Sequence, residues 1–203
     1  MKKIVLFSIL LITAVGCQQV AKLIFGIKNP KLENPESVKE YIVKNDWDTQ
    51  NNFIAKDTAS YKAVIGLFYK SIPEAVLFDK NGNELIYKET SESCNAGLFK
   101  VIPDLQKDSQ LKKGTHQLKN VLNQYTLSLD GNSNSIMDDS DYYLLIDWAI
   151  FTGKLNKDHV LPWENLAKNN KNCKIKVLKL NLDIQDNWGW TEKDIKIGGT
   201  KVK

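Results

Sequence analysis

Three cysteines are the residues of this chain best able to carry covalent chemistry, and their settings differ. Cys17 follows Ala14-Val15-Gly16, Cys94 precedes a segment with helical periodicity, and Cys173 stands just before an alternating segment. The thiolate is the reactive form of cysteine, and the amide dipoles at the start of a helix favour it. Cys94 is therefore the candidate reactive thiol of a lone-thiol enzyme that acts on peroxide or on disulfides.

A structural role for Cys94 is the alternative, as a buried thiol or as the disulfide partner of Cys173. A lone-thiol enzyme also needs a nearby Thr, Arg or His at a recognisable spacing, and the sequence offers none. Disulfides form in oxidising compartments. The bond requires two Cα atoms within roughly 4.4–6.8 Å, which a sequence does not reveal. Both alternatives stay open.

The N-terminus has the three-part pattern of a secretion signal. Lys2 and Lys3 form a basic region, Ile4–Ile12 is apolar except for Ser8, and small residues precede Cys17. The apolar run is shorter than the roughly 20 residues that a membrane-spanning helix needs. An ordinary secretory signal and a retained anchor are the alternatives to the interpretation that follows.

This N-terminal pattern resembles a bacterial lipoprotein signal. The resemblance implies that residues 1–16 are removed and that Cys17 becomes a lipidated first residue, with palmitate among the attached chains. Gln18 stands where aspartate would retain such a protein in the inner membrane, so the resemblance favours the outer membrane of the cell envelope. The partner that it implies is the membrane, contacted through the lipid anchor.

Length and charge limit the remaining chain to a few classes. Residues 17–203 are long enough for one ordinary domain with a sizeable core. The chain has 28 Lys and Arg against 24 Asp and Glu, and the lysines are scattered and do not form a stripe. Nucleic-acid binding usually needs a clustered basic surface. We therefore expect no nucleic-acid partner.

Carboxylates and histidines supply weaker candidates. Asp147 lies in an apolar segment, so its pKa rises if the side chain points inward. Residues 130–141 have oxygen ligands at spacings similar to a calcium loop, but Ser135 and Asp141 stand where glycine and glutamate are required. His116 and His159 are too far apart in sequence to argue for a transition-metal site. We expect neither a metal nor a cofactor.

Apolar periodicity and turn residues predict the elements that must position these groups. Helices are predicted at 35–44 with Asn34 as cap, at 58–68 with Asp57 as cap, after Ser93 or Asn95 to Leu105, at 115–125 and at 157–169. Strands are predicted at 52–55, within 70–79, and at 84–88, 142–149 and 174–183. This order of elements is typical of an α/β domain.

The unit from Tyr142 to Asp183 resembles the centre of a thioredoxin. The strand ends in Trp148-Ala149, the next helix contains Pro162, and Leu180-Asn181-Leu182-Asp183 closes the second strand. The turn Phe151–Asn156 is where that family keeps its Cys-x-x-Cys pair, and here it contains no cysteine. Ile72-Pro73 precedes a predicted hairpin, as does the family's proline, which is usually cis.

The two halves of the resemblance occur in swapped order. Residues 35–105 are similar to the C-terminal half of a thioredoxin, and residues 115–183 to its N-terminal half. The implied fold is a three-layer thioredoxin-like α/β domain with one mixed sheet, in circularly permuted order. It would span 35–190, after a tether at 17–34 and before a polar tail at 191–203.

The resulting function hypothesis is an envelope-anchored lipoprotein whose thioredoxin-like domain is redox-inactive and serves as a binding or assembly module. Thr152, Gly153 and Lys154, together with Ile72 and Pro73, would border a groove for a carboxylate or an extended peptide. The partner would be an envelope protein or peptide. The alternatives are the lone-thiol enzyme that uses Cys94, and a structural lipoprotein without a groove.

Overall fold

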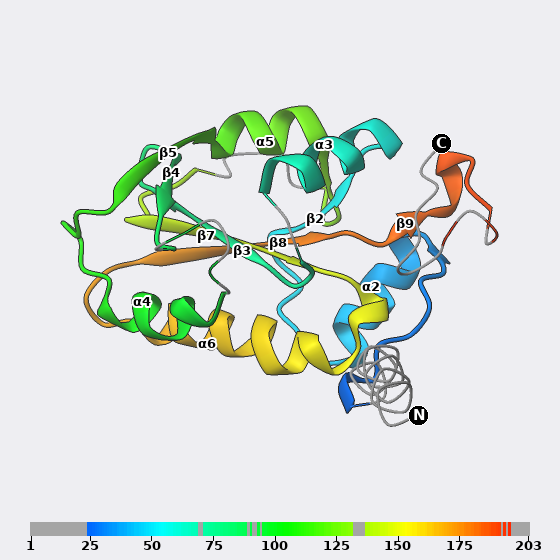
Figure 1. Cartoon of the computed structure of the whole chain (residues 1–203), viewed down its shortest axis with the longest axis horizontal. Helices are drawn as coiled ribbons and strands as arrows, with labels where there is room; N and C mark the ends of the chain where they lie inside the picture. The colour runs from blue at the N-terminus through cyan, green and yellow to red at the C-terminus, as the bar shows by residue number, and fades with distance from the viewer. Residues whose placement is uncertain are drawn as a thin grey trace, which may run out of the picture.

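Helices cover both faces of a mixed β-sheet (Figure 1). The computed structural model describes residues 24–68, 71–88, 90, 93, 95–131, 137–191, 193 and 195. In this part of the chain seven strands form the sheet, in the order β5-β4-β3-β7-β8-β2-β6. Their bounds are β5 Lys112–Gln117, β4 Asn83–Ile86, β3 Ala75–Asp79, β7 Tyr142–Trp148, β8 Ile175–Asn181, β2 Asn52–Ala55 and β6 Thr126–Ser128.

The three strands β7, β8 and β2 run parallel, and the remaining neighbours pair antiparallel. A separate pair joins β1 (Leu32–Glu33) to β9 (Ile184–Gln185) in parallel. Strands β7 and β8 of the second half lie between β3 and β2 of the first half, because β3 pairs with β7 and β2 pairs with β8. The sheet is thus built from both halves.

Two apolar clusters lie on opposite faces of the sheet. One contains buried side chains of α2, α4 and α6, and the other contains those of α3 and α5. The helices are α2 Pro35–Lys44, α3 Thr58–Phe68, α4 Leu98–Asp104, α5 Leu118–Tyr125 and α6 Leu161–Asn169. Every side chain of β7 is buried, which explains the nearly continuous apolar sequence of this central strand.

The predicted helix caps of α2 and α3 are confirmed. Asn34 Oδ1 accepts the Ser37 N–H at 2.9 Å, and Ser37 Oγ accepts the Asn34 N–H at 3.0 Å, which makes a reciprocal capping box. Asp57 Oδ1 accepts the Ser60 N–H at 2.7 Å at the start of α3. These bonds satisfy amide groups that a helix leaves without partners in its first turn.

The helix predicted at 115–125 is wrong in its first turn. Strand β5 extends to Gln117, and α5 begins at Leu118. The Glu84 carboxylate accepts the Thr115 and His116 N–H groups at 3.0 and 3.1 Å, and β5 pairs with β4. Contacts with a distant strand override the local helical pattern here.

The cap predicted for the fourth helix is also wrong. Asn95 lies in a short 3-10 helix, Asn95–Gly97, and Gly97 is the residue before α4. The Asn95 side chain instead donates to the Pro73 carbonyl at 2.9 Å. The helix predicted at 157–169 begins as one turn of π-helix, Asn156–Val160, before α6. Strand β6 was not predicted.

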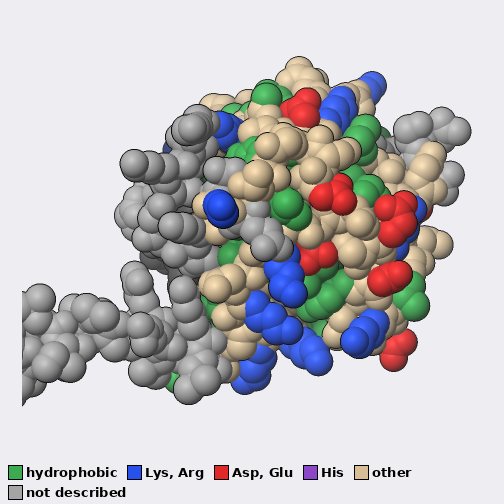
Figure 2. All heavy atoms as spheres, turned by 90° about the vertical axis from the view of Figure 1, so that its right-hand side faces the viewer, with side chains coloured by type: hydrophobic (Ala, Val, Ile, Leu, Met, Phe, Trp, Pro, Cys, Tyr) green, Lys and Arg blue, Asp and Glu red, His purple; other side chains and the backbone are tan. Residues whose placement is uncertain are grey.

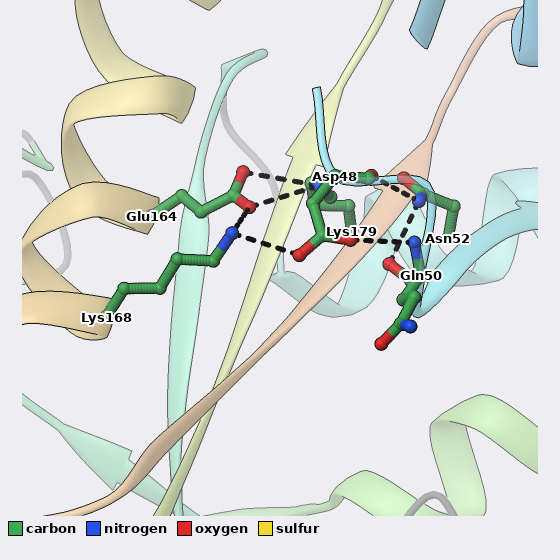
Figure 3. A network of polar contacts seen from close by, with 6 residues as sticks. All are labelled: Asp48, Gln50, Asn52, Glu164, Lys168 and Lys179. Atoms are coloured by element: carbon green, nitrogen blue, oxygen red, sulfur yellow. Dashed lines mark hydrogen bonds and ion pairs between the residues drawn. The ribbon is translucent and has the colours of Figure 1, made fainter. Parts of the chain in front are cut away.

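A buried ion network joins α6, β8 and the segment before β2 (Figure 3). Lys179 Nζ lies 3.2 Å from the Glu164 carboxylate and donates to the Asp48 carbonyl at 2.8 Å. Lys168 bridges Glu164 at 2.8 Å and Asp48 at 2.9 Å. The side chain of Lys179 is 1% exposed, so its charge depends on these partners. Among the described residues, no helix has the length and apolar character needed to cross a bilayer.

Candidate functional site

The carboxyl ends of β7 and β8 lie beside the amino end of β3 (Figure 1). We call this side of the sheet, which is formed by the ends of strands and not by an outer strand, the edge. In α/β sheets this edge is where ligands usually bind. The turn after β7 lies here, as do Pro73 and Asp183. The segment Phe25–Lys28, which we call the strap, also reaches this edge.

Pro73 lies beside the end of β7. Ala75 pairs with Ile146 in the β3–β7 register, and the same register continues to Glu74 and Asp147. The Asp147 N–H donates to the Glu74 carbonyl at 2.9 Å, and the Glu74 N–H donates to Asp147 Oδ1. The Ile72–Pro73 peptide bond is cis, as predicted.

Thr152 does not face an open groove. Its side chain is buried, and its hydroxyl lies 2.7 Å from the Ala149 carbonyl and 2.8 Å from Asn156 Oδ1. The Asn156 amide donates to the same Ala149 carbonyl at 2.8 Å. These bonds hold the turn together from within, so the Thr152 hydroxyl is already engaged.

Gly153 lies under the strap. The Lys28 N–H donates to the Phe151 carbonyl at 2.8 Å. Gly153 has a φ of +59°, and a Cβ at this position would lie 2.3 Å from the Gly26 carbonyl oxygen. Glycine is therefore required at 153 both by its backbone conformation and by the close approach of the strap. Neither requirement is visible in the sequence.

The other predicted groove residues are Lys154, Ile72 and Pro73, and they differ in exposure. Lys154 is exposed, and its Nζ lies 3.7 Å from Asp158 one turn later. Ile72 is half-buried and Pro73 is buried. The structure thus places Ile72 and Pro73 at the same sheet edge as the turn, and leaves Lys154 as the solvent-facing member of the set.

Asp147 is a buried acid beside this edge. Asp147 is completely buried. The loss of solvation raises the pKa of its carboxyl well above the ordinary value, and the charge of the nearby Glu74 raises it further. Within the described residues, Asp147 Oδ2 has no hydrogen-bond partner. Glu74 is also buried, and its carboxylate pairs with Lys88 at 2.9 Å.

Asp183 is a second buried acid at the same edge, and sequence reasoning missed its role. Its carboxylate accepts the Ile150 N–H and the Asn181 amide, both at 2.7 Å. Burial raises the pKa of Asp183 to about 7, and Glu33 on β1 adds to the rise. The pKa of Tyr61 is raised by burial and by the charges of Asp183 and Asp147. The sequence signal that could have indicated this role of Asp183 is its position directly after a strand of alternating pattern.

Aromatic rings cover the neighbouring part of α3. The Tyr61 ring lies 5.6 Å from Trp188 and 6.5 Å from Trp190, measured between centroids, and Trp190 Nε1 donates to Thr58 Oγ1 at 2.9 Å. Figure 2 views the end of the molecule where α2 and β9 lie. Basic, acidic and apolar side chains share this face, so its charge is mixed.

Two hollows lie on the β4 side of the sheet. One, of about 360 Å³, is bordered by the end of α3 and by Glu74 and Lys88. The other, of about 720 Å³, lies between Tyr87, Lys88 and α4. Neither is lined by residues of the turn after β7.

The cysteines lie apart from this edge where the structure describes them. Cys173 is a free, buried thiol before the amino end of β8, and its Sγ lies 3.4 Å from the Leu105 carbonyl. Burial raises its pKa to about 11, which opposes thiolate formation. Cys17 and Cys94 lie outside the described residues.

None of the described residues form a group of three His, Cys, Asp or Glu side chains that could hold a metal ion. Residues 132–136 of the calcium-like loop lie outside the described set.

Comparisons with protein-family models, curated proteins and solved structures each return no match for the chain.

Proposed function

We propose that the chain is a lipid-anchored envelope protein whose redox-inactive, thioredoxin-like domain binds an extended polypeptide partner. The observation that carries the proposal is the contact between the strap and the turn after β7. The Lys28 N–H donates to the Phe151 carbonyl at 2.8 Å. Main-chain recognition of this kind is how many domains bind extended peptides.

The arrangement of the sheet supports the thioredoxin-like part of the proposal. The unit β7-α6-β8 resembles the N-terminal half of a thioredoxin. The hairpin β3-β4, which follows Pro73, resembles the C-terminal half. They lie side by side in one sheet, because β3 pairs with β7 over five residue pairs. A permuted thioredoxin-like domain requires this pairing.

Redox inactivity follows from the composition of the turn. Disulfide exchange proceeds through a mixed disulfide that a second thiol must resolve. Residues 149–161 contain no cysteine, and Thr152 stands where the first thiol of the family would be. Cys173 lies at the opposite, amino end of β8, since its neighbour Ile175 pairs with Tyr142 at the start of β7.

The anchor defines where the module would work. Lipidation of Cys17 would leave a short tether before the strap and would hold the strap edge near the membrane. The proposed location is the cell envelope, with the outer membrane favoured by Gln18. The partners would be the membrane through the lipid, and an envelope protein or peptide at the turn.

Site-specific photocrosslinking in the native envelope tests the binding role. A photoreactive residue replaces Lys154, whose side chain is 59% exposed beside the turn. The matched control replaces Lys174, which is 55% exposed at the amino end of β8. We expect one discrete polypeptide adduct at 154 and none at 174. Equal labelling at both positions, or no adduct at 154, contradicts the proposal.

A further inference from the structure

We infer that the turn Phe151–Gly153 is a polypeptide-binding site that the strap Phe25–Lys28 already occupies, so that a partner must displace the strap. The inference rests on the proposed function and deepens it, because it gives the site an internal competitor. Three features of the contact support it: its main-chain atoms, the glycine requirement at 153, and the weak hold of the strap.

The contacts between the strap and the turn are made by main-chain atoms. The Lys28 N–H bonds to the Phe151 carbonyl at 2.8 Å, while the Gly26 and Phe25 carbonyl groups lie above Gly153. Groups of this kind are present in every polypeptide. A second polypeptide segment can make the same contacts if it carries a glycine that adopts the positive φ of Gly26.

Glycine at 153 makes that approach possible. A Cβ there would lie 2.3 Å from the Gly26 carbonyl oxygen and 3.0 Å from the Phe25 oxygen, and both contacts involve backbone atoms that cannot rotate away. Gly26 itself has a φ of +60° and no atom within 4 Å of its own missing Cβ. The strap thus needs glycine at 26 for its conformation, and glycine at 153 for the space.

The strap is held more weakly than the domain that it covers. Gly26 and Lys28 of the strap are exposed, Phe25 and Ile27 are only half-buried, and Ile24 just before it is 59% exposed. Within the described residues, the strap and the turn share one backbone hydrogen bond. Beyond the strap, β1 pairs with β9 and keeps the chain attached. A segment with few buried contacts can open without unfolding the rest.

The strap and an added peptide compete for the turn, and this competition determines how much the apparent Kd of the peptide changes when the strap is released. A tethered segment competes at an effective concentration on the order of millimolar. A peptide offered from solution therefore binds much more tightly once the strap is released. We expect its apparent Kd to fall by roughly the ratio of that effective concentration to the Kd of the free segment, which is about tenfold for a Kd of about 0.1 mM.

The test uses the full-length protein in detergent and a dye-labelled peptide with the sequence of residues 24–30, Ile-Phe-Gly-Ile-Lys-Asn-Pro. Fluorescence anisotropy measures its binding to wild type, to Gly26→Pro, and to Gly26→Pro combined with Gly153→Ala. Proline fixes φ near −65°, so it cannot adopt the +60° of Gly26, and the strap is released. Gly153→Ala then blocks the vacated site.

The inference holds if Gly26→Pro binds the peptide and the double variant does not, with wild type about tenfold weaker. Equal binding to wild type and Gly26→Pro overturns it, as does binding that survives Gly153→Ala. Gly189→Ala is the control for a positive-φ glycine, because its Cβ would meet no atom within 4 Å. Lys28→Pro, which removes the N–H bonded to Phe151, replaces Gly26→Pro if that variant fails to fold. This assay needs no envelope partner, so its result is independent of crosslinking at 154.

Discussion

Asp183 Oδ2 accepts the N–H of Ile150 at 2.7 Å and so joins the end of β8 to the turn after β7. The same carboxyl also accepts the Asn181 amide and is almost fully buried. Burial raises its pKa to about 7, and the carboxylate of Glu33 contributes. A group that fixes the turn therefore titrates near neutral pH.

Stability should fall as pH rises through this range, because the folded protein holds the Asp183 proton more tightly than the unfolded chain. The unfolded carboxyl has its ordinary pKa of 3.8, so between pH 4 and 7 the folded state binds more protons. We expect Asp183 to lower the free energy of unfolding by up to about 4 kcal/mol across that window. The full stabilising effect is present below pH 4 and is lost above pH 7.

Urea unfolding of wild type and Asp183→Asn at pH 4, 5.5 and 7.5 checks this. Asparagine can still accept the Ile150 N–H but does not titrate, so the difference between the two proteins should change with pH. Asp147 remains in both and cancels in the comparison. A difference that stays constant from pH 4 to 7.5 contradicts the raised pKa of Asp183.

The buried ion network should show strong coupling between Glu164 and Lys179. Burial lowers the pKa of Lys179, and the Glu164 carboxylate opposes that effect. Glu164→Gln leaves a buried ammonium without its carboxylate and should cost about 3–5 kcal/mol. Lys179→Met should cost less, because Glu164 keeps Lys168 at 2.8 Å.

A double-mutant cycle measures this coupling by urea unfolding. The variant that carries both Glu164→Gln and Lys179→Met should be more stable than the sum of the two single effects predicts, because no buried charge is left unpaired. Additivity within about 0.5 kcal/mol would show that the two residues act independently.

Disulfide-reduction activity should be absent, because the turn offers no thiol and Cys173 has a pKa of about 11. We expect no turnover above background for the soluble form Lys22–Lys203, and no change with Cys94→Ala. Turnover that Cys94→Ala abolishes would instead support the lone-thiol enzyme. Titration of thiols with and without reductant gives an independent measure of the reactivity of Cys94.

Acylation of Cys17 is expected from the basic, apolar and small-residue pattern that ends at this cysteine. Growth with a fatty-acid analogue should label the wild-type protein and leave Cys17→Ser unlabelled. Cys94→Ser is the control and should be labelled as strongly as wild type. Equal labelling of the Cys17→Ser protein would exclude Cys17 as the lipid attachment site.

Local signals in the sequence were sufficient for the elements that depend on neighbouring residues. Asn34 and Pro35 start α2 because the cap and the fixed φ of proline act within one turn. The apolar run of β7 predicts a central strand because both of its faces must be covered. The turn without cysteine is likewise a property of the sequence alone.

Only the tertiary structure decided the rest, because it depends on residues far apart in the chain. Residues 112–117 became a strand through β4, against a local helical pattern. Asp183 gained its raised pKa from burial among elements that the sequence does not place together. The strap met Gly153 across more than a hundred residues, and a contact between two backbones leaves no side-chain pattern by which a sequence could reveal it.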